Sequence, residues 1–292
     1  MNRVRALTHC QEMSYSGKGV TVAILDSGIY PHLDYADRMI GFYDILTGRT
    51  KAYDDQGHGT HIAGIIGGSG RASGRTYVGM APEASLFSIK VLDRKGNGET
   101  EQVIRALEYL ISVKERYRVR IVNMSVGTIP KAGQAEKNGL VQAVEKAWDA
   151  GLVVVAAAGN NGPEPMSITT PGISRKVITV GSSEKDKRLE NGKIAQGASS
   201  RGPTPFCVCK PDILAPGKGV ISCRNARNGY ISKTGTSMST AVVSGAVALL
   251  LEKKPWLTPV EVKLALYQSA VDLGWDRNRQ GWGMLDVKRL LA

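Results

Sequence analysis

Short apolar runs rich in Val, Ile and Ala recur along the chain and alternate with longer segments of helical periodicity. Runs of this kind, apolar at consecutive positions, are typical of parallel strands buried on both faces. They predict strands at Val20–Leu25, Ser85–Val91, Arg120–Met124, Val153–Ala157 and Val177–Val180. Apolar residues at helical spacing predict helices at Thr100–Tyr117, Leu140–Ala150, Ala241–Leu251 and, after a capping box at Thr258 and Glu261, as far as Ala270.

Alternating strands and helices indicate an α/β fold of three layers, in which a mostly parallel, twisted sheet carries helices on both faces. The 292 residues are 42% hydrophobic, which is enough apolar material for a large core. Internal repeats and linkers are absent from the sequence. The Gly-rich segment Gly67–Gly74 and the polar segment Glu184–Ser200 are interpreted as surface loops. We therefore expect a single domain over residues 1–292.

The net charge of +12 would favour nucleic acid, anionic membranes or acidic substrates as partners. The basic residues are scattered, however, and the chain has neither a basic helix nor an aromatic platform. Its longest apolar stretches are far shorter than the ~20 residues that span a bilayer. We expect no nucleic-acid partner, no membrane partner and a monomer.

Four cysteines, Cys10, Cys207, Cys209 and Cys223, are too few for the disulfide framework of a chain this long. Free thiols favour a reducing compartment, and the polar N-terminus lacks the apolar core of a signal peptide. We therefore expect a cytoplasmic protein. The alternative is a secreted protein in its mature form, without signal and prodomain.

Two acid–base candidates stand at the ends of predicted elements. Asp26 follows the first strand, where a carboxylate needs a cationic or hydrogen-bonding partner, or serves as a turn cap. His58 lies between Gly57 and Gly59, which leave its imidazole uncovered at a helix start. His61 points into the apolar helix and fits a structural role. Without an acid between the two histidines, a zinc site of the His-Glu-x-x-His type is not expected.

Two further candidates, Ser237 and Asn160, are suited to nucleophilic attack and to oxyanion binding. Ser237 enters the apolar helix from Gly235, where a serine is most often a cap, but free N–H groups there also favour developing negative charge. Asn160 ends the strand Val153–Ala157 after Gly159, either in a left-handed turn or as a donor to an oxyanion.

Taken together, these segments resemble the subtilisin-like serine proteases (subtilases) from about Gly17 to Leu291. The order Asp, His, Ser along the chain is that of the family and differs from other serine hydrolases. The matching stretches are Ile24–Ile29, Gly57–Gly64, Asn123–Gly127, Ala156–Asn160 and Gly235–Ala241.

The resemblance implies a serine endopeptidase. Ser237 would attack the scissile carbonyl, His58 would take its proton, and Asp26 would hold the imidazole. Asn160 and the Ser237 N–H would bind the oxyanion. No cofactor would be required.

The resemblance also implies a cleft in which an extended polypeptide pairs with two backbone segments as an added strand. These segments are Ser125, Val126 and Gly127 on one side and Gly98, Glu99 and Thr100 on the other, with Gly159 nearby. One of Thr169 and Thr170 would shape the first side-chain pocket. Asp54 and Asp55 either favour a basic substrate residue on the acyl side or cap the backbone of a solvated loop.

The segment Gly67–Gly74 lacks the Asn-rich calcium ligands of secreted relatives, and arginine in this region would repel a cation. We expect no metal ligands at this place, while a weaker calcium site elsewhere stays open. Asp26 lies too near Met1 for a prodomain to precede it within this chain. We expect a longer precursor that removes its own leader, and we therefore count its own prodomain as a second partner.

Overall fold

The computed structural model describes residues 1–11, 14–129, 138–184 and 198–292. Its centre is a sheet of seven parallel strands in the order β2-β3-β1-β4-β5-β6-β7. The strands are β1 (Thr21–Asp26), β2 (Met39–Asp44), β3 (Ser85–Lys90), β4 (Val119–Met124), β5 (Val153–Ala157), β6 (Ile178–Ser182) and β7 (Ile213–Ala215). Two more strands, β8 (Val220–Cys223) and β9 (Tyr230–Lys233), form an antiparallel hairpin.

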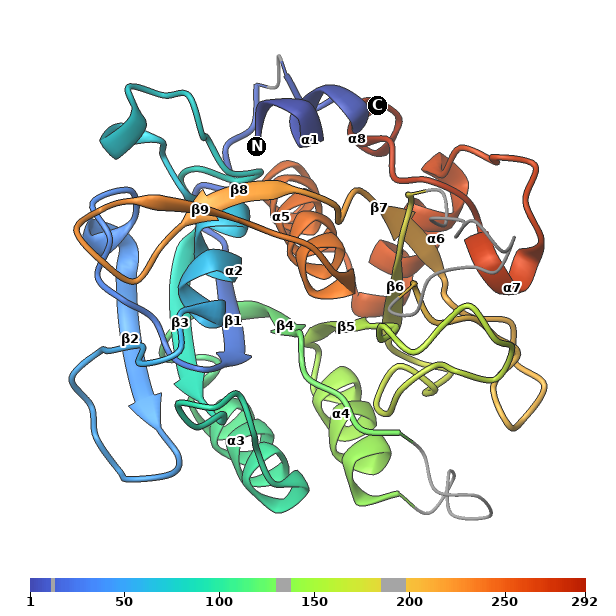
Figure 1. Cartoon of the computed structure of the whole chain (residues 1–292), viewed down its shortest axis with the longest axis horizontal. Helices are drawn as coiled ribbons and strands as arrows, with labels where there is room; N and C mark the ends of the chain where they lie inside the picture. Colours follow the sequence, from blue (N-terminus) through green and yellow to red (C-terminus); the bar gives the residue numbers. More distant parts are fainter. Residues whose placement is uncertain (12–13, 130–137, 185–197) are drawn as a thin grey trace, which may run out of the picture.

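Helices cover both faces of the sheet, with α2 and α5 on one face and α3 and α4 on the other (Figure 1). The helices are α1 (Asn2–Leu7), α2 (His58–Gly67), α3 (Thr100–Val113), α4 (Gly139–Asp149), α5 (Thr236–Lys253), α6 (Pro259–Ser269), α7 (Arg277–Gln280) and α8 (Val287–Leu290), with 3-10 turns at Ala36–Arg38 and Arg71–Ser73. The predicted three-layer α/β fold is confirmed. Within the described ranges, no helix combines the length and apolar character of a membrane span.

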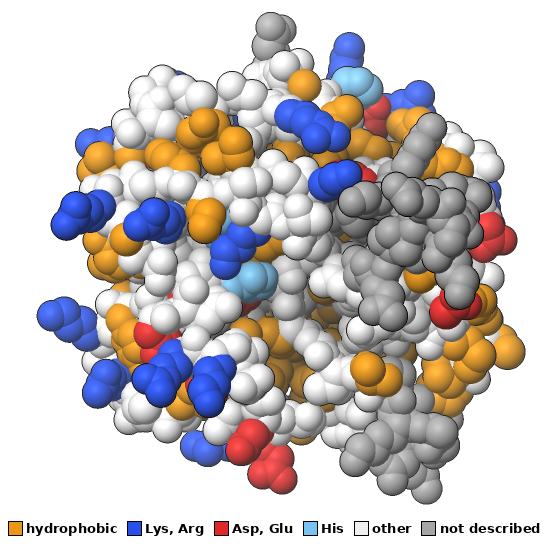
Figure 2. Space-filling view, viewed as in Figure 1, with side chains coloured by type: hydrophobic (Ala, Val, Ile, Leu, Met, Phe, Trp, Pro, Cys, Tyr) orange, Lys and Arg blue, Asp and Glu red, His pale blue; other side chains and the backbone are white. Residues whose placement is uncertain are grey.

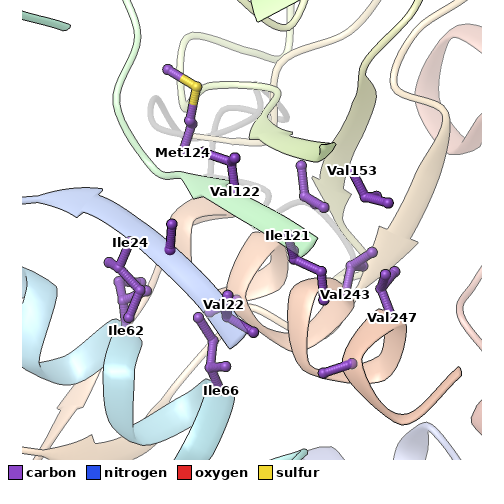
Figure 3. Close-up of a cluster of buried hydrophobic side chains, with 14 of the residues drawn as sticks. Val22, Ile24, Ile62, Ile66, Ile121, Val122, Met124, Val153, Val243 and Val247 are labelled. Atoms are coloured by element: carbon purple, nitrogen blue, oxygen red, sulfur yellow. The ribbon is translucent and has the colours of Figure 1, made fainter. Parts of the chain in front are cut away.

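One large core extends over both faces of the sheet, and Figure 3 shows a part of it with side chains from the sheet and from the helices α2 and α5. Val22 and Ile121 from the sheet, Ile66 from α2 and Val243 from α5 are fully buried there. Helix α5 is buried along nearly its whole length, because it passes through the middle of the molecule. Its sequence is therefore apolar on all sides, because the helix is buried on all sides and has no solvent-facing polar face.

All five predicted strands form; β5 has the predicted ends, and the other four differ from the prediction by one or two residues at one or both ends. Helix α3 ends at Val113 rather than Tyr117, because Arg118 adopts a φ of 49° and turns the chain into β4. The capping box before α6 is confirmed, since the Thr258 N–H donates to Glu261 at 2.8 Å and the Glu261 N–H donates to Thr258 at 3.3 Å. The predicted loop at 67–74 contains a 3-10 turn, and most of the predicted loop at 184–200 lies outside the described residues.

Strand β2 was not predicted, because it is an edge strand with a glycine in its middle. Gly41 is required there, since a Cβ at this position would lie 2.4 Å from the ring of Phe87. Strand order reverses at β1, which pairs with β3 on one side and β4 on the other. In open parallel sheets, ligands bind at the carboxyl ends of the strands beside such a reversal. The ends of β1 and β4 therefore mark the place to look for a site.

Candidate active site

The last residue of β1, Asp26, is fully buried and holds the imidazole of His58. The His58 Nδ1–H donates to both carboxylate oxygens, at 2.8 Å to Oδ1 and 2.9 Å to Oδ2. The N–H of Ser27 donates to Oδ1 at 2.7 Å. Because the carboxylate accepts from Nδ1, the imidazole keeps Nε2 available for proton transfer.

The glycines around His58 allow the start of α2 to approach β1 closely. Gly57 has a φ of 92°, and a Cβ on Gly59 would lie 2.1 Å from the carbonyl oxygen of Gly28. The His58 N–H donates to Gln56 Oε1 at 2.7 Å, which satisfies one of the free N–H groups of the first helical turn. The side chain of His58 is 21% exposed, so its ring is packed yet reachable.

Burial is the largest influence on the pKa of His58 and lowers it. The charge of Asp26 and its hydrogen bond to the ring together raise this pKa by more, so that it lies above the usual value for histidine. The charge of Lys233 lowers the pKa of His58 to a smaller extent. The imidazole is therefore a stronger base than a free histidine, with its basicity supplied by Asp26.

Ser237 lies in the first turn of α5, beside the end of β4. Its hydroxyl donates to the carbonyl of Ser125 at 3.4 Å, and the Ser125 hydroxyl donates to the carbonyl of Ser237 at 3.4 Å. The Asn123 side chain donates to Ser125 Oγ at 3.1 Å and accepts from Ser244 Oγ at 2.9 Å. The end of β4 is thus joined to α5 at two places, at Ser237 through Ser125 and at Ser244 through Asn123.

The roles of Asn123 and Ser244 were not predicted from the sequence. Asn123 is fully buried within β4, where an amide needs partners, and Ser244 lies two turns into α5 on the buried side. An asparagine at the end of an otherwise apolar run was the available signal.

Asn160 follows β5 and lies against the segment before Ser237. Its Oδ1 accepts hydrogen bonds from the Thr236 N–H at 3.0 Å and from the Thr236 hydroxyl at 3.3 Å. These bonds assign the oxygen to Thr236 and leave the Nδ2 donor for another partner. A Cβ added at Gly235 would lie 3.3 Å from that Nδ2 atom, so the donor is beside the start of α5.

A cleft of about 350 Å³ lies between the segments that follow β3 and β4. Six of the seven predicted substrate-binding residues line it, namely Gly98, Glu99, Thr100, Ser125, Val126 and Gly127. The seventh, Gly159, is not among the residues of this lining. A Cβ on Gly159 would lie 2.6 Å from Thr169 Cγ2, and one on Gly127 would lie 2.8 Å from Thr169 Oγ1.

Thr169 therefore fills the space between Gly127 and Gly159, and its hydroxyl donates to the carbonyl of Ala158 at 3.2 Å. Thr170 is fully buried, and its backbone pairs with Thr128 instead. Of the two threonines, the geometry favours Thr169 as the one that shapes a pocket.

The geometry favours backbone capping for Asp54, the second of the two alternatives. Its carboxylate accepts from the N–H groups of Gly57 and Thr60 and from the Ser27 hydroxyl, at 2.7, 2.9 and 2.9 Å. Asp55 pairs at 2.7 Å with Lys90, which is buried. This contact of Lys90 was not predicted. The Asp54 carboxylate is therefore fully engaged, whereas Asp55 is 42% exposed and pairs with Lys90 through one of its two oxygens.

His61 is structural, as expected. Its Nε2–H is shared between the carbonyls of Val220 at 3.0 Å and Ile231 at 3.1 Å, which join α2 to the β8–β9 hairpin. Burial, with the charge of Lys233, lowers the pKa of His61 to about 3. The ring is therefore neutral at any pH in which the protein works.

Within the described ranges, His32, Asp34 and Cys223 form one group whose ligand-type atoms lie within 4.8 Å of one another. The Cys223 thiol donates to Asp34 Oδ2 at 3.6 Å, and the Tyr230 hydroxyl donates to the same oxygen at 2.8 Å. Burial raises the pKa of the Cys223 thiol well above its usual value. A buried, protonated hydrogen-bond network accounts for this group.

Asp34 also orders the loop at 67–74, because its Oδ1 accepts from the Ala72 N–H at 2.9 Å. All four cysteines are free thiols, with Cys10 and Cys223 buried and Cys207 and Cys209 exposed.

Sequence comparison shows which known proteins this chain resembles. Serine protease AprX of Bacillus subtilis (strain 168) is 44% identical over 267 residues, which are 85% of this chain and 60% of AprX. The chain thus spans less than two thirds of that relative's length. Subtilisin DY of Bacillus licheniformis is 34% identical over 281 residues, 95% of this chain and 93% of that protein.

Solved structures give the same result. A cold adapted subtilisin-like serine proteinase superposes with a TM-score of 0.76 at 28% identity, covering 94% of this chain and 91% of that one. Sphericase superposes with a TM-score of 0.81 at 28% identity, covering 97% of each chain. The sequence profile described as the Subtilase family matches residues 17–283. The chain therefore belongs to the subtilase family of serine proteases.

Proposed function

We propose that this chain is a serine endopeptidase in which Asp26, His58 and Ser237 hydrolyse peptide bonds of extended polypeptides. The observation that carries the proposal is the pair of hydrogen bonds, 2.8 and 2.9 Å long, from His58 Nδ1 to the buried Asp26 carboxylate. A buried carboxylate that fixes one imidazole nitrogen prepares the other to accept a proton.

In the first step, Ser237 Oγ attacks the scissile carbonyl while His58 Nε2 takes the hydroxyl proton. The hydroxyl must first leave its 3.4 Å hydrogen bond to the Ser125 carbonyl, which is long and therefore weak. Asp26 stabilises the imidazolium that forms. His58 then gives the proton to the leaving amine, and water repeats the sequence to release the acyl group.

Negative charge on the carbonyl oxygen is stabilised by the Asn160 Nδ2–H and the Ser237 N–H. The fixed orientation of the Asn160 amide supports this role, because its oxygen is held by Thr236. A donor already oriented before substrate binds costs no reorganisation during reaction. These steps need no metal or cofactor.

The acyl part of the substrate lies in the 350 Å³ cleft, between the segments Gly98–Thr100 and Ser125–Gly127. Backbone pairing with both segments reads little of the substrate sequence. Thr169, next to Gly127, limits the side chain at the scissile bond.

Hydrolysis of a denatured protein, with and without a reagent that modifies active-site serines, tests the proposal. We expect new peptide ends, loss of activity after modification, and labelling confined to Ser237. A folded protein that neither cleaves nor is labelled is a binding module on this fold, and the proposal is then wrong.

A further inference from the structure

The β8–β9 hairpin is fastened to the start of α2, beside His58. His61, one turn after His58, donates to the carbonyls of Val220 in β8 and Ile231 in β9. The Asn225 side chain, in the turn of the hairpin, donates to the carbonyl of Asp54 at 3.0 Å. The hairpin therefore keeps one position relative to the catalytic imidazole.

The hairpin carries positive charge only. Arg224 and Arg227 are exposed in its turn, Lys233 is half-buried at the end of β9, and residues 218–235 contain no acidic residue. Among the described residues, none of these three cations has an ion pair. Figure 2 shows Lys and Arg side chains gathered on the half of the face where Figure 1 draws β2, β3, β8 and β9.

Among the described residues, the acidic groups packed against the hairpin form no ion pair with its cations. Asp54 is buried and caps the turn before α2, Asp34 accepts from the Ala72 N–H and the Tyr230 hydroxyl, and Glu184 accepts from the Gly217 N–H. Each carboxylate is thus engaged by other groups. The cations of the hairpin are left for a mobile anion or a substrate.

Lys233 is the hairpin cation nearest to the chemistry. It precedes Ser237 by four residues, on the segment that leads from β9 into α5. The charge of Lys233 lowers the pKa of both histidines of α2, the catalytic His58 and the structural His61. An ion pair with substrate at this place would be partly shielded from water.

The direction in which the substrate leaves the site follows from where its acyl part lies. The cleft at Ser125–Gly127 takes the acyl part, so the chain must leave in the other direction. The leaving amine also receives its proton from His58, which places it at the start of α2. The first side chains after the scissile bond therefore come near the hairpin.

We propose that the β8–β9 hairpin selects substrates with an acidic residue just after the scissile bond, and that Lys233 is the residue that pairs with it. This inference rests on the proposed peptidase function. It names a substrate class: polypeptides with Asp or Glu on the leaving side. A partly exposed ion pair changes a rate constant by roughly threefold to fivefold.

Quenched fluorescent peptides that differ only in the residue after the scissile bond test this proposal, with the cleavage position confirmed by mass spectrometry. For the unmodified protein we expect kcat/KM to fall in the order Asp, Asn, Lys, with roughly threefold to fivefold between Asp and Asn. The difference should shrink in high salt, which screens exposed charges.

Three variants of Lys233 carry the test. Lys233→Gln should make the Asp and Lys peptides equal within twofold, Lys233→Glu should reverse their order, and Lys233→Arg should retain it. Lys95→Gln is the matched control, because Lys95 is an exposed cation beside Gly96 at the other end of the cleft. We expect it to leave the preference unchanged.

Equal cleavage of all three peptides by the unmodified protein would overturn the proposal, and so would a preference that survives in Lys233→Gln. Either result leaves the peptidase function standing. Failure to cleave any peptide, with a folded protein, would instead refute the proposed function itself.

Discussion

Ser237 and Ser125 exchange hydrogen bonds across the site, each hydroxyl donating to the carbonyl of the other at 3.4 Å. Both bonds are long, so they orient the Ser237 hydroxyl without holding it tightly. Ser125 belongs to a segment that lines the cleft, and Ser237 opens the helix that passes through the core. The Ser237 hydroxyl and one wall of the cleft are therefore positioned by the same contact.

Ser237→Ala should retain the fold and lose nearly all peptidase activity. The substitution removes a half-exposed hydroxyl and its weak bond to Ser125, so the free energy of unfolding should change by less than about 0.5 kcal/mol. We expect kcat to fall at least about a thousandfold, because the covalent step is lost. Melting temperature and peptide hydrolysis measure the two effects. Turnover within tenfold of the unmodified protein would exclude Ser237 as the nucleophile.

The pH dependence of kcat/KM should report His58. The base must be neutral, so activity rises with pH through the pKa of His58 and is lost below it. Because Asp26 raises this pKa beyond what burial takes away, the midpoint should lie above the ordinary histidine value of about 6.5.

Lys233→Gln should move this midpoint to higher pH, since the charge of Lys233 lowers the pKa of His58. Lys233→Arg keeps the charge and serves as the control. A rate that is flat from about pH 5 to 9, with chemistry rate-limiting, would contradict the general-base role.

Asn160→Leu should lower kcat by about 10²–10³ with little change in KM, as expected for a donor that acts mainly in the transition state. Asn160→Gln is a useful comparison, because it keeps the amide but displaces it by one methylene. Both variants lose the hydrogen bonds to Thr236, so melting temperatures must accompany the kinetics. A higher KM with an unchanged kcat in both variants would assign Asn160 to substrate binding instead.

The chain pattern was sufficient to predict five of the seven strands of the sheet and the polar residues that follow or end two of them. Asp26 ends β1 and Asn160 follows β5, and polar side chains after apolar runs are visible in a sequence. Contacts between distant segments were not visible. The exchange between Ser125 and Ser237 and the pairing of Lys90 with Asp55 depend on how the elements pack.

The β8–β9 hairpin shows the same limit for secondary structure. Its strands are short, and β9 is largely exposed, so neither gives a buried apolar run. Hydrogen bonds from His61 hold the hairpin in place. A structural role for His61 was predicted, but the residues that it bonds to were not.

Asn123 should be a positioning residue for the site. It is buried and joins Ser244 in α5 to Ser125. Asn123→Ala leaves the Ser244 hydroxyl without this partner, and we expect about 1–3 kcal/mol of lost stability together with lower kcat. Ser244→Ala should cost less, because it removes only one bond. Denaturant unfolding and single-turnover kinetics separate the two effects. Unchanged kcat in a destabilised Asn123→Ala would show a purely structural role.

Thr169 should set the size of the residue accepted on the acyl side of the scissile bond. Its side chain fills the space between Gly127 and Gly159, where it is only 6% exposed.

Thr169→Gly should raise kcat/KM for a peptide with Phe at that position, relative to a peptide with Ala there, by about tenfold. This is the range for a few methylenes in an apolar pocket. Thr169→Val keeps the shape but not the bond to Ala158, and should leave the preference as it was. Peptide pairs differing only at this position give the measurement. A preference that changes to the same extent in Thr169→Val and in Thr169→Gly would assign selectivity to the hydroxyl rather than to volume.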